Sequence, residues 1–156
     1  MMRKRSALSV LVAHHDPAIL RLITITLQAS GFPVVICSDG QTALQKFSDD
    51  LPRLVMLDTH LPIIDGITAC RRIRAASTTP IVMLASLDNQ RDAALALEAG
   101  ADDYIRMPFG TEELVARVRA VFRRAYAGLG ASDTIVIGPL EIDTARLSAR
   151  IAGDDP

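Results

Sequence analysis

The sequence predicts a doubly wound α/β domain, in which helices cover both faces of a parallel sheet. Short apolar segments alternate with segments whose apolar residues recur at helical spacing, and this alternation repeats five times between Leu8 and Ala127. The segment Leu54–Leu57 is apolar at every position, which is typical of a strand buried on both faces. Because parallel strands need crossover connections, the intervening helices complete the prediction.

The predicted strands are short and mostly apolar, and they occupy residues 8–13, 33–37, 54–57, 80–84 and 103–105. The predicted helices follow at about 16–30, 40–51, 65–75, 88–100 and 112–127. Asp16-Pro17 supplies an N-cap and a proline at the first helical position, and Gly31 follows where a C-cap glycine belongs. Ser38-Asp39-Gly40 can cap the second helix, Asp65-Gly66 starts the third, and Gly100 closes the fourth.

Composition bounds the class of protein. The 156 residues are 49% hydrophobic and 22% charged, as in a globular domain with a core. The net charge of −1 gives no overall attraction to nucleic acid or anionic lipid. Cys37 and Cys70 lack CxxC spacing and are expected to be reduced. The basic start lacks a signal cleavage site, and no run reaches the roughly 18 apolar residues of a membrane span, so we expect a cytoplasmic protein without membrane contact.

A change of composition divides the chain after Ala127. Residues 1–127 form the predicted α/β domain, and 128–133 are a linker rich in small residues. Residues 134–156 contain three short predicted strands, at 134–137, 140–143 and 147–151. This last part is too short to bury a core of its own, so we expect it to begin a larger domain or to pack on the first one.

One acid ends the central predicted strand. Asp58 follows Leu54–Leu57 directly, and the carboxyl ends of the strands border the crevice where open α/β sheets bind ligands. A carboxylate at this position is therefore the first candidate for a functional group. The alternative is an aspartate that only caps the following loop.

Four blocks of sequence carry a resemblance to a known family: VLVAHHDPAIL, VMLDTHLPIIDG, IVMLAS and GADDYIRMPF. In this order and at these separations they resemble the receiver domain of two-component response regulators, over roughly Leu8 to Arg124. The resemblance implies a flavodoxin-like (βα)5 fold. It also implies that Asp58 corresponds to the aspartate that accepts a phosphoryl group from a histidine kinase, although the sequence identifies no kinase.

The tail resembles a second module. TIVIGPLEIDTARLSARIAG is similar to the opening antiparallel strands of the winged-helix DNA-binding domain in the OmpR/PhoB class. The resemblance implies a promoter-binding partner domain that lies mostly outside this chain.

The pocket around Asp58 departs from the family pattern. The acid pair that binds Mg²⁺ in receivers is replaced by His14 and His15, and Asp16 matches the third acidic position, where it also reads as an N-cap. The usual hydroxyl and lysine match Ala85 and Met107, whereas the switch aromatic remains as Tyr104. Because magnesium prefers oxygen ligands, we expect its binding to be weakened severely and expect no cofactor.

The histidines leave two further hypotheses open. A protonated His14 or His15 beside Asp58 would supply positive charge in place of the metal and lysine. Alternatively His15, Asp58 and His60 could hold a transition metal, since imidazole and carboxylate are zinc ligands. Against this stand the simple loss of a magnesium site and a solvent-directed His60 side chain.

The family resemblance also implies a homodimer through the face made by the fourth helix, fifth strand and fifth helix. The charges that match this face are Glu98, Asp103, Arg117 and Arg119. We expect pairs between Asp103 and Arg117 and between Glu98 and Arg119, with a solvated helix face as the alternative. The Met107-Pro108 bond matches one that the family holds in cis.

Taken together, the sequence predicts the regulatory, dimerising receiver of a transcription regulator, atypical and phosphorylated weakly or not at all at Asp58. A conventional phosphoacceptor receiver is the alternative within the family. A small-molecule sensor, binding in the hydroxyl-poor cleft around Ala85 and Met107, is the alternative outside it. We do not expect an enzyme, because the sequence has no glycine-rich phosphate loop and no Ser or Cys nucleophile with an evident base.

Overall fold

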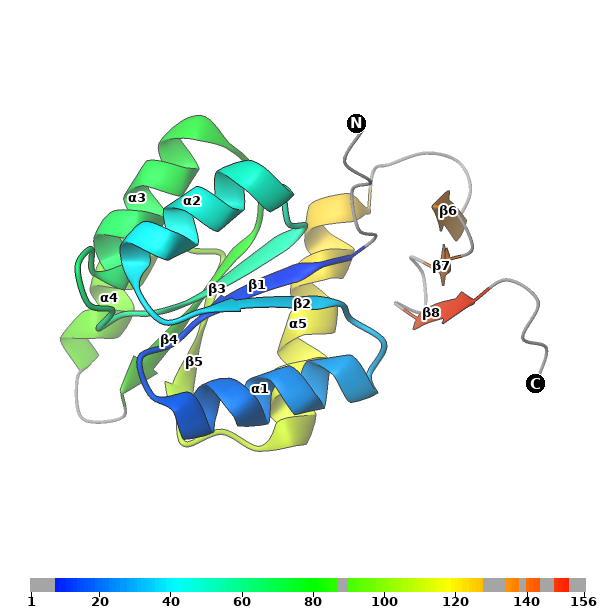
Figure 1. Cartoon of the computed structure of the whole chain (residues 1–156), viewed down its shortest axis with the longest axis horizontal. Helices are drawn as coiled ribbons and strands as arrows, with labels where there is room; N and C mark the ends of the chain where they lie inside the picture. Colours follow the sequence, from blue (N-terminus) through cyan, green and yellow to red (C-terminus); the bar gives the residue numbers. More distant parts are fainter. Residues whose placement is uncertain (1–7, 87–89, 128–133, 138–139, 144–147, 152–156) are drawn as a thin grey trace.

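The computed structural model of the chain describes residues 8–86, 90–127, 134–137, 140–143 and 148–151 (Figure 1). Its first sheet contains strands β1 (Val10–Ala13), β2 (Val34–Cys37), β3 (Leu54–Asp58), β4 (Ile81–Ser86) and β5 (Asp103–Met107). The helices are α1 (Pro17–Ala29), α2 (Gly40–Asp50), α3 (Gly66–Ala76), α4 (Gln90–Glu98) and α5 (Thr111–Tyr126). The predicted fourth-helix start at Asp88 and the linker 128–133 lie outside the described residues.

The sheet is parallel throughout and has the strand order β2-β1-β3-β4-β5. This confirms the predicted doubly wound α/β fold of the flavodoxin-like type. The chain passes outward from β1 to β2 and then returns to β3, so the strand order reverses between β1 and β3. Ligand crevices in open α/β sheets lie at such a switch point, next to the carboxyl ends of the strands. Asp58 ends β3 at this place.

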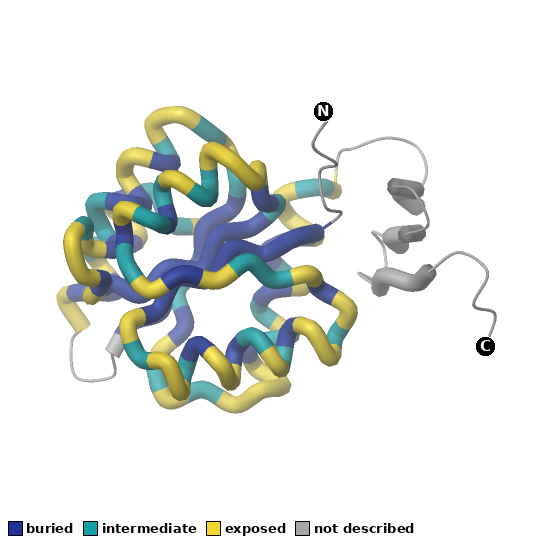
Figure 2. The backbone as a smooth tube through the Cα atoms, in the orientation of Figure 1, coloured by how far each residue is buried: buried dark blue, intermediate teal, exposed yellow. Residues whose placement is uncertain are grey.

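Two apolar layers cover the sheet. One contains Leu54 and Met56 together with residues of α1 and α5, and the other contains Val55 and Leu57 together with residues of α2, α3 and α4. The four strand residues are 0% exposed, and the central strands form the buried interior in Figure 2. The prediction that this strand is buried on both faces is therefore confirmed.

Aspartates begin three of the helices. Asp16, Asp39 and Asp65 accept hydrogen bonds from the backbone N–H groups of Ala18, Thr42 and Thr68 at 2.9, 2.7 and 2.8 Å. Each such cap contributes about 1 kcal/mol, because it satisfies an N–H that has no partner within the helix. The predicted N-cap role of Asp16 is confirmed.

The last helix is anchored at its far end. The Tyr126 hydroxyl donates to the carbonyl oxygen of Arg53 at 2.6 Å, just before β3 begins. The rings of Phe32 and Phe122 stack at 5.5 Å, and the Phe122 and Tyr126 rings lie 5.9 Å apart. Apolar rings and one hydrogen bond thus tie the end of α5 to the amino-terminal edge of the sheet.

The remaining described strands are β6 (Thr134–Ile137), β7 (Leu140–Asp143) and β8 (Ser148–Ile151), which form an antiparallel sheet in the order β6-β7-β8. Three strands were predicted here, the third starting one residue earlier.

The Met107-Pro108 bond is cis, as predicted. Among the described residues, no helix is both long and apolar enough to cross a membrane.

Candidate functional site

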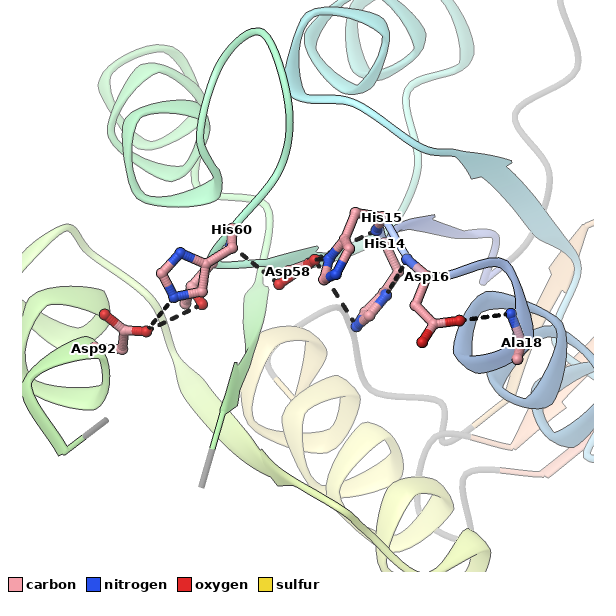
Figure 3. A network of polar contacts seen from close by, with 8 residues as sticks. His14, His15, Asp16, Ala18, Asp58, His60 and Asp92 are labelled. Carbon is pink, nitrogen blue, oxygen red and sulfur yellow. Dashed lines mark hydrogen bonds and ion pairs between the residues drawn. The ribbon is translucent and has the colours of Figure 1, made fainter. Parts of the chain in front are cut away.

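Asp58 lies buried at the end of β3 with both carboxylate oxygens occupied (Figure 3). Oδ2 contacts Nδ1 of His15 and accepts the His15 backbone N–H at 3.3 Å. Oδ1 accepts the backbone N–H of His60 at 3.0 Å. The loop after β1 and the loop after β3 thus supply all the hydrogen bonds that the carboxylate receives from described residues.

These contacts determine the charge of the site. Burial alone raises the pKa of Asp58, but the hydrogen bonds from His15 and His60, with the nearby His14, outweigh it and hold the pKa below its ordinary value. Asp58 is therefore an ionised carboxylate at neutral pH and can only accept hydrogen bonds. It follows that Nδ1 of His15 carries the proton between them.

His14 has a different environment from its neighbour. It is buried, its Nε2 lies 3.9 Å from Oδ2 of Asp58, and its ring stacks on that of His15 with centroids 5.0 Å apart. Its Nδ1 accepts the backbone N–H of Asp16 at 2.9 Å, so the ring proton sits on Nε2 and the ring is neutral. Burial lowers the pKa of His14, although Asp58 opposes this. The hypothesis that a protonated His14 supplies positive charge does not hold in this structure.

His60 turns away from Asp58. Its Nε2 lies 2.7 Å from Oδ2 of Asp92, an acid of α4 that is only 7% exposed, and Thr59 donates to the same oxygen at 3.4 Å. Figure 3 shows the two pairs, His15 with Asp58 and His60 with Asp92, on opposite sides of the end of β3. The predicted metal set of His15, Asp58 and His60 is therefore not assembled.

Sequence reasoning missed Asp92. The signal that could have found it is helical spacing, because Asp92 precedes the buried Ala96 by about one turn and so falls on the buried face of α4. An acid on such a face needs a partner. The sequence does not show that the partner is His60.

The other altered positions lie at the ends of the neighbouring strands. Ala85 is buried near the end of β4, in register with Arg106. Met107 is half-buried and ends β5, and Tyr104 is half-buried against the apolar layer of α2, α3 and α4. The strand ends therefore carry neither a hydroxyl at 85 nor a cation at 107.

The pocket does not fit the magnesium ion of the family. Among the described residues, the donor atoms that come together are those of His14, His15 and Asp58, within 4.8 Å of one another. One carboxylate and two imidazoles are a poor set for a cation that takes oxygen ligands. A transition metal fits them better, but the tautomer of His14 places a proton on the nitrogen that faces Asp58.

The charges of the predicted dimer face pair within one chain. Arg117 lies 3.2 Å from Asp103 and 3.1 Å from Glu113, one helical turn away. Glu98 and Arg119 are exposed. The structure therefore brings Asp103 and Arg117 together, as an intrachain pair.

The comparisons with known proteins agree with this fold. A family model described as the response regulator receiver domain matches residues 10–119. The transcriptional regulatory protein CseB of Streptomyces coelicolor is 41% identical over 155 residues, covering 92% of this chain and 66% of the relative. The DNA-binding response regulator MtrA of Mycolicibacterium smegmatis is 43% identical over 134 residues, covering 86% and 58%. The chain spans less than two thirds of the length of these relatives.

Solved structures give the same result. The BeF3-activated N-terminal receiver domain of Klebsiella pneumoniae RstA superposes with a TM-score of 0.69 at 37% identity, covering 72% of this chain and 96% of that one. The receiver domain of the Francisella response regulator 1452 gives 0.70 at 29% identity, covering 76% and 98%. With the parallel sheet and the acid at the end of β3, these matches show that the chain belongs to the response regulator receiver family.

Proposed function

We propose that this receiver regulates a transcription factor while its Asp58 accepts a phosphoryl group weakly or not at all. The observation that carries the proposal is the contact between Nδ1 of His15 and Oδ2 of Asp58. Attack on phosphorus uses a lone pair of a carboxylate oxygen, and here both lone pairs of Oδ2 already accept N–H groups of His15.

The charge balance of the pocket supports the same conclusion. A phosphoryl group adds about −1.5 to −2 charge, and transfer is promoted by cations that neutralise the oxygens. His14 is neutral and Met107 has no charge, so neither of these positions supplies a cation. His15 supplies a hydrogen bond to Asp58 instead of a metal site.

The test is phosphorylation by acetyl phosphate with Mg²⁺, followed by intact mass, with Asp58→Ala as control. We expect little or no adduct on the wild-type chain. The triple variant His14→Asp, His15→Asp, Met107→Lys should gain a hydroxylamine-sensitive adduct, because it regains oxygen ligands and a cation. A wild-type adduct of that kind, lost in Asp58→Ala, would make this a conventional phosphoacceptor.

We further propose that the site holds no resident metal. Binding at Nε2 of His14 needs a change of tautomer and the loss of the hydrogen bond from Asp16. Equilibrium dialysis against micromolar zinc at neutral pH should leave the protein without a stoichiometric ion. Retention of one zinc, abolished in His14→Asn, would contradict this.

We also propose a cytoplasmic homodimer through the face of α4, β5 and α5, joined to promoter DNA by a winged-helix domain. The names of the relatives support the DNA-binding role. Leu97 of α4 is 50% exposed and supports an apolar contact at this face. Sedimentation should show a dimer that Leu97→Glu dissociates, whereas Leu22→Glu on α1, 44% exposed in the wild type, should leave it intact.

A further inference from the structure

We infer that the imidazole of His15 is a nucleophile that accepts a phosphoryl group from phosphoramidate-type donors, with Asp58 as its orienting carboxylate. This rests on the proposed function, because Asp58 can hold the ring only while it is itself unmodified. The roles of acid and neighbour are then exchanged relative to the aspartyl chemistry of the family.

The orientation of the ring carries the inference. Asp58 is a buried acceptor that holds Nδ1–H of His15, so the ring nitrogen left to present a lone pair is Nε2. Nε2 lies on the far side of the ring from the carboxylate. Within the described part of the chain it has no hydrogen-bond partner, and the His15 side chain is 52% exposed. A donor can therefore reach it from solvent.

A carboxylate, an imidazole and a free ring nitrogen are the parts of an activated histidine. Histidine is one of the side chains that form covalent intermediates, and a neighbouring group that orients the ring improves its reactivity. The carboxylate also stabilises the imidazolium that forms when the ring reacts. Two backbone N–H groups, from His15 and His60, hold Asp58 in place for this role.

The transfer balances without a metal or another reactant. The Nε2 lone pair attacks phosphorus, an N–P bond forms, and the P–N bond of phosphoramidate breaks. The leaving nitrogen is already protonated and departs as ammonia with the bonding pair. Nδ1 keeps its proton throughout, and Asp58 balances the positive charge that develops on the ring.

The other two histidines serve as built-in comparisons. His14 is buried, and its Nε2 carries a proton, so it has no free lone pair there. His60 is held through Nε2 by Asp92, which leaves only Nδ1, the nitrogen beside its own backbone. Sterically, Nδ1 is the more hindered position of an imidazole. We therefore expect reaction at His15 rather than at His14 or His60.

The experiment incubates the full chain with potassium phosphoramidate at pH 8 in EDTA, followed by intact mass and peptide mapping. We expect one phosphoryl adduct on His15 that survives alkali but is lost in acid. His15→Asn should abolish the adduct, because the amide is not a nucleophile. The variant is a matched one, since the amide can still donate a hydrogen bond to Asp58. His60→Asn should leave the rate unchanged, and Asp58→Asn should slow it about tenfold, the effect of one charge-assisted hydrogen bond. Circular dichroism shows whether each variant is folded.

The following results would overturn the inference. These are no adduct on the folded chain, an adduct on His14 or His60, an adduct that persists in His15→Asn, and a rate equal to that of the chain in urea. An adduct that alkali removes and that Asp58→Asn abolishes would overturn both the inference and the proposed function. No adduct with either phosphoramidate or acetyl phosphate would overturn the inference alone.

Discussion

Two histidine–aspartate pairs flank the end of β3. They contain the same two residue types but differ in their contacts. In each pair the aspartate is buried and the histidine side chain is more than half exposed, 52% for His15 and 60% for His60. Asp58 also receives two backbone N–H groups, whereas Asp92 receives from the other described residues the long contact of Thr59. The pairs further differ in the ring nitrogen that they use. The two pairs therefore differ in how many described backbone groups hold the acid.

The largest expected effect comes from disturbing both pairs together. A Cβ at Gly66 would overlap the carbonyl oxygen of Asp58, and the Gly66 N–H also closes the loop onto Thr59 at 3.1 Å. We expect Gly66→Ala to lower the free energy of unfolding by about 3 kcal/mol. Gly110→Ala is the matched control, because nothing lies near its Cβ, and it should cost under ~1 kcal/mol. Equal losses in urea denaturation would refute the comparison.

Double-mutant cycles separate the two pairs. We expect a coupling free energy of about 2 kcal/mol between His15 and Asp58 and about 1 kcal/mol between His60 and Asp92, because the first acid is held on both oxygens. The measurement is the free energy of unfolding of the single and double alanine variants. A larger coupling for His60 and Asp92 would reverse the proposed order.

Lowering the pH should reduce the free energy of unfolding through His14, the neighbour of the His15–Asp58 pair. Burial lowers the pKa of His14 below its ordinary 6.5, so the unfolded chain binds the proton more readily. The resulting stability is complete above pH 6.5 and is lost as the pH falls toward the folded pKa. Asp58, whose pKa also lies below its ordinary value, adds a further loss below about pH 4.

The variant that checks this is His14→Asn, whose side-chain oxygen can replace Nδ1 as the acceptor for Asp16. Denaturation at pH 7 and at pH 5.5 should show a smaller loss for the variant than for the wild type. An unchanged loss would assign the acid sensitivity to other groups.

The smallest effect is expected at the surface. Arg117 is 43% exposed in its pairs with Asp103 and Glu113, and solvent screens such contacts. Arg117→Ala should lower the free energy of unfolding by under ~1 kcal/mol, and 1 M salt should remove most of the difference. A salt-independent loss of several kcal/mol would show that this surface contributes more than either buried acid.

The sequence predicted the parts of the fold that repeat along the chain. The apolar strands, the caps at Asp16 and Asp65, and the order of the elements follow from local spacing. Strand ends were less accurate, since β4 continues to Ser86 and β5 to Met107, where backbone pairing extends past the apolar residues. The predicted strand over 8–13 begins only at Val10, because Leu8 has a positive φ of 49°.

The candidate site was predicted in its strand-end positions but not in its contacts. Asp58, His14 and His15 lie together because the ends of β1 and β3 are adjacent in the sheet. The orientation of the His60 side chain depends on its contact with Asp92 of α4, and that contact forms only once the chain has folded. Spacing along the chain carries no information about that side-chain pair.

The anchor of Tyr126 on Arg53 gives β3 a second significance. The strand begins beside the residue that fixes the end of α5 and finishes at Asp58, five residues or about 16 Å farther on. The strand is buried and its backbone is paired with β1 on one side and β4 on the other, which restricts its bending. The end of α5 is therefore connected to the pocket through β3. We expect a displacement of Arg53 along the strand axis to displace Asp58 as well.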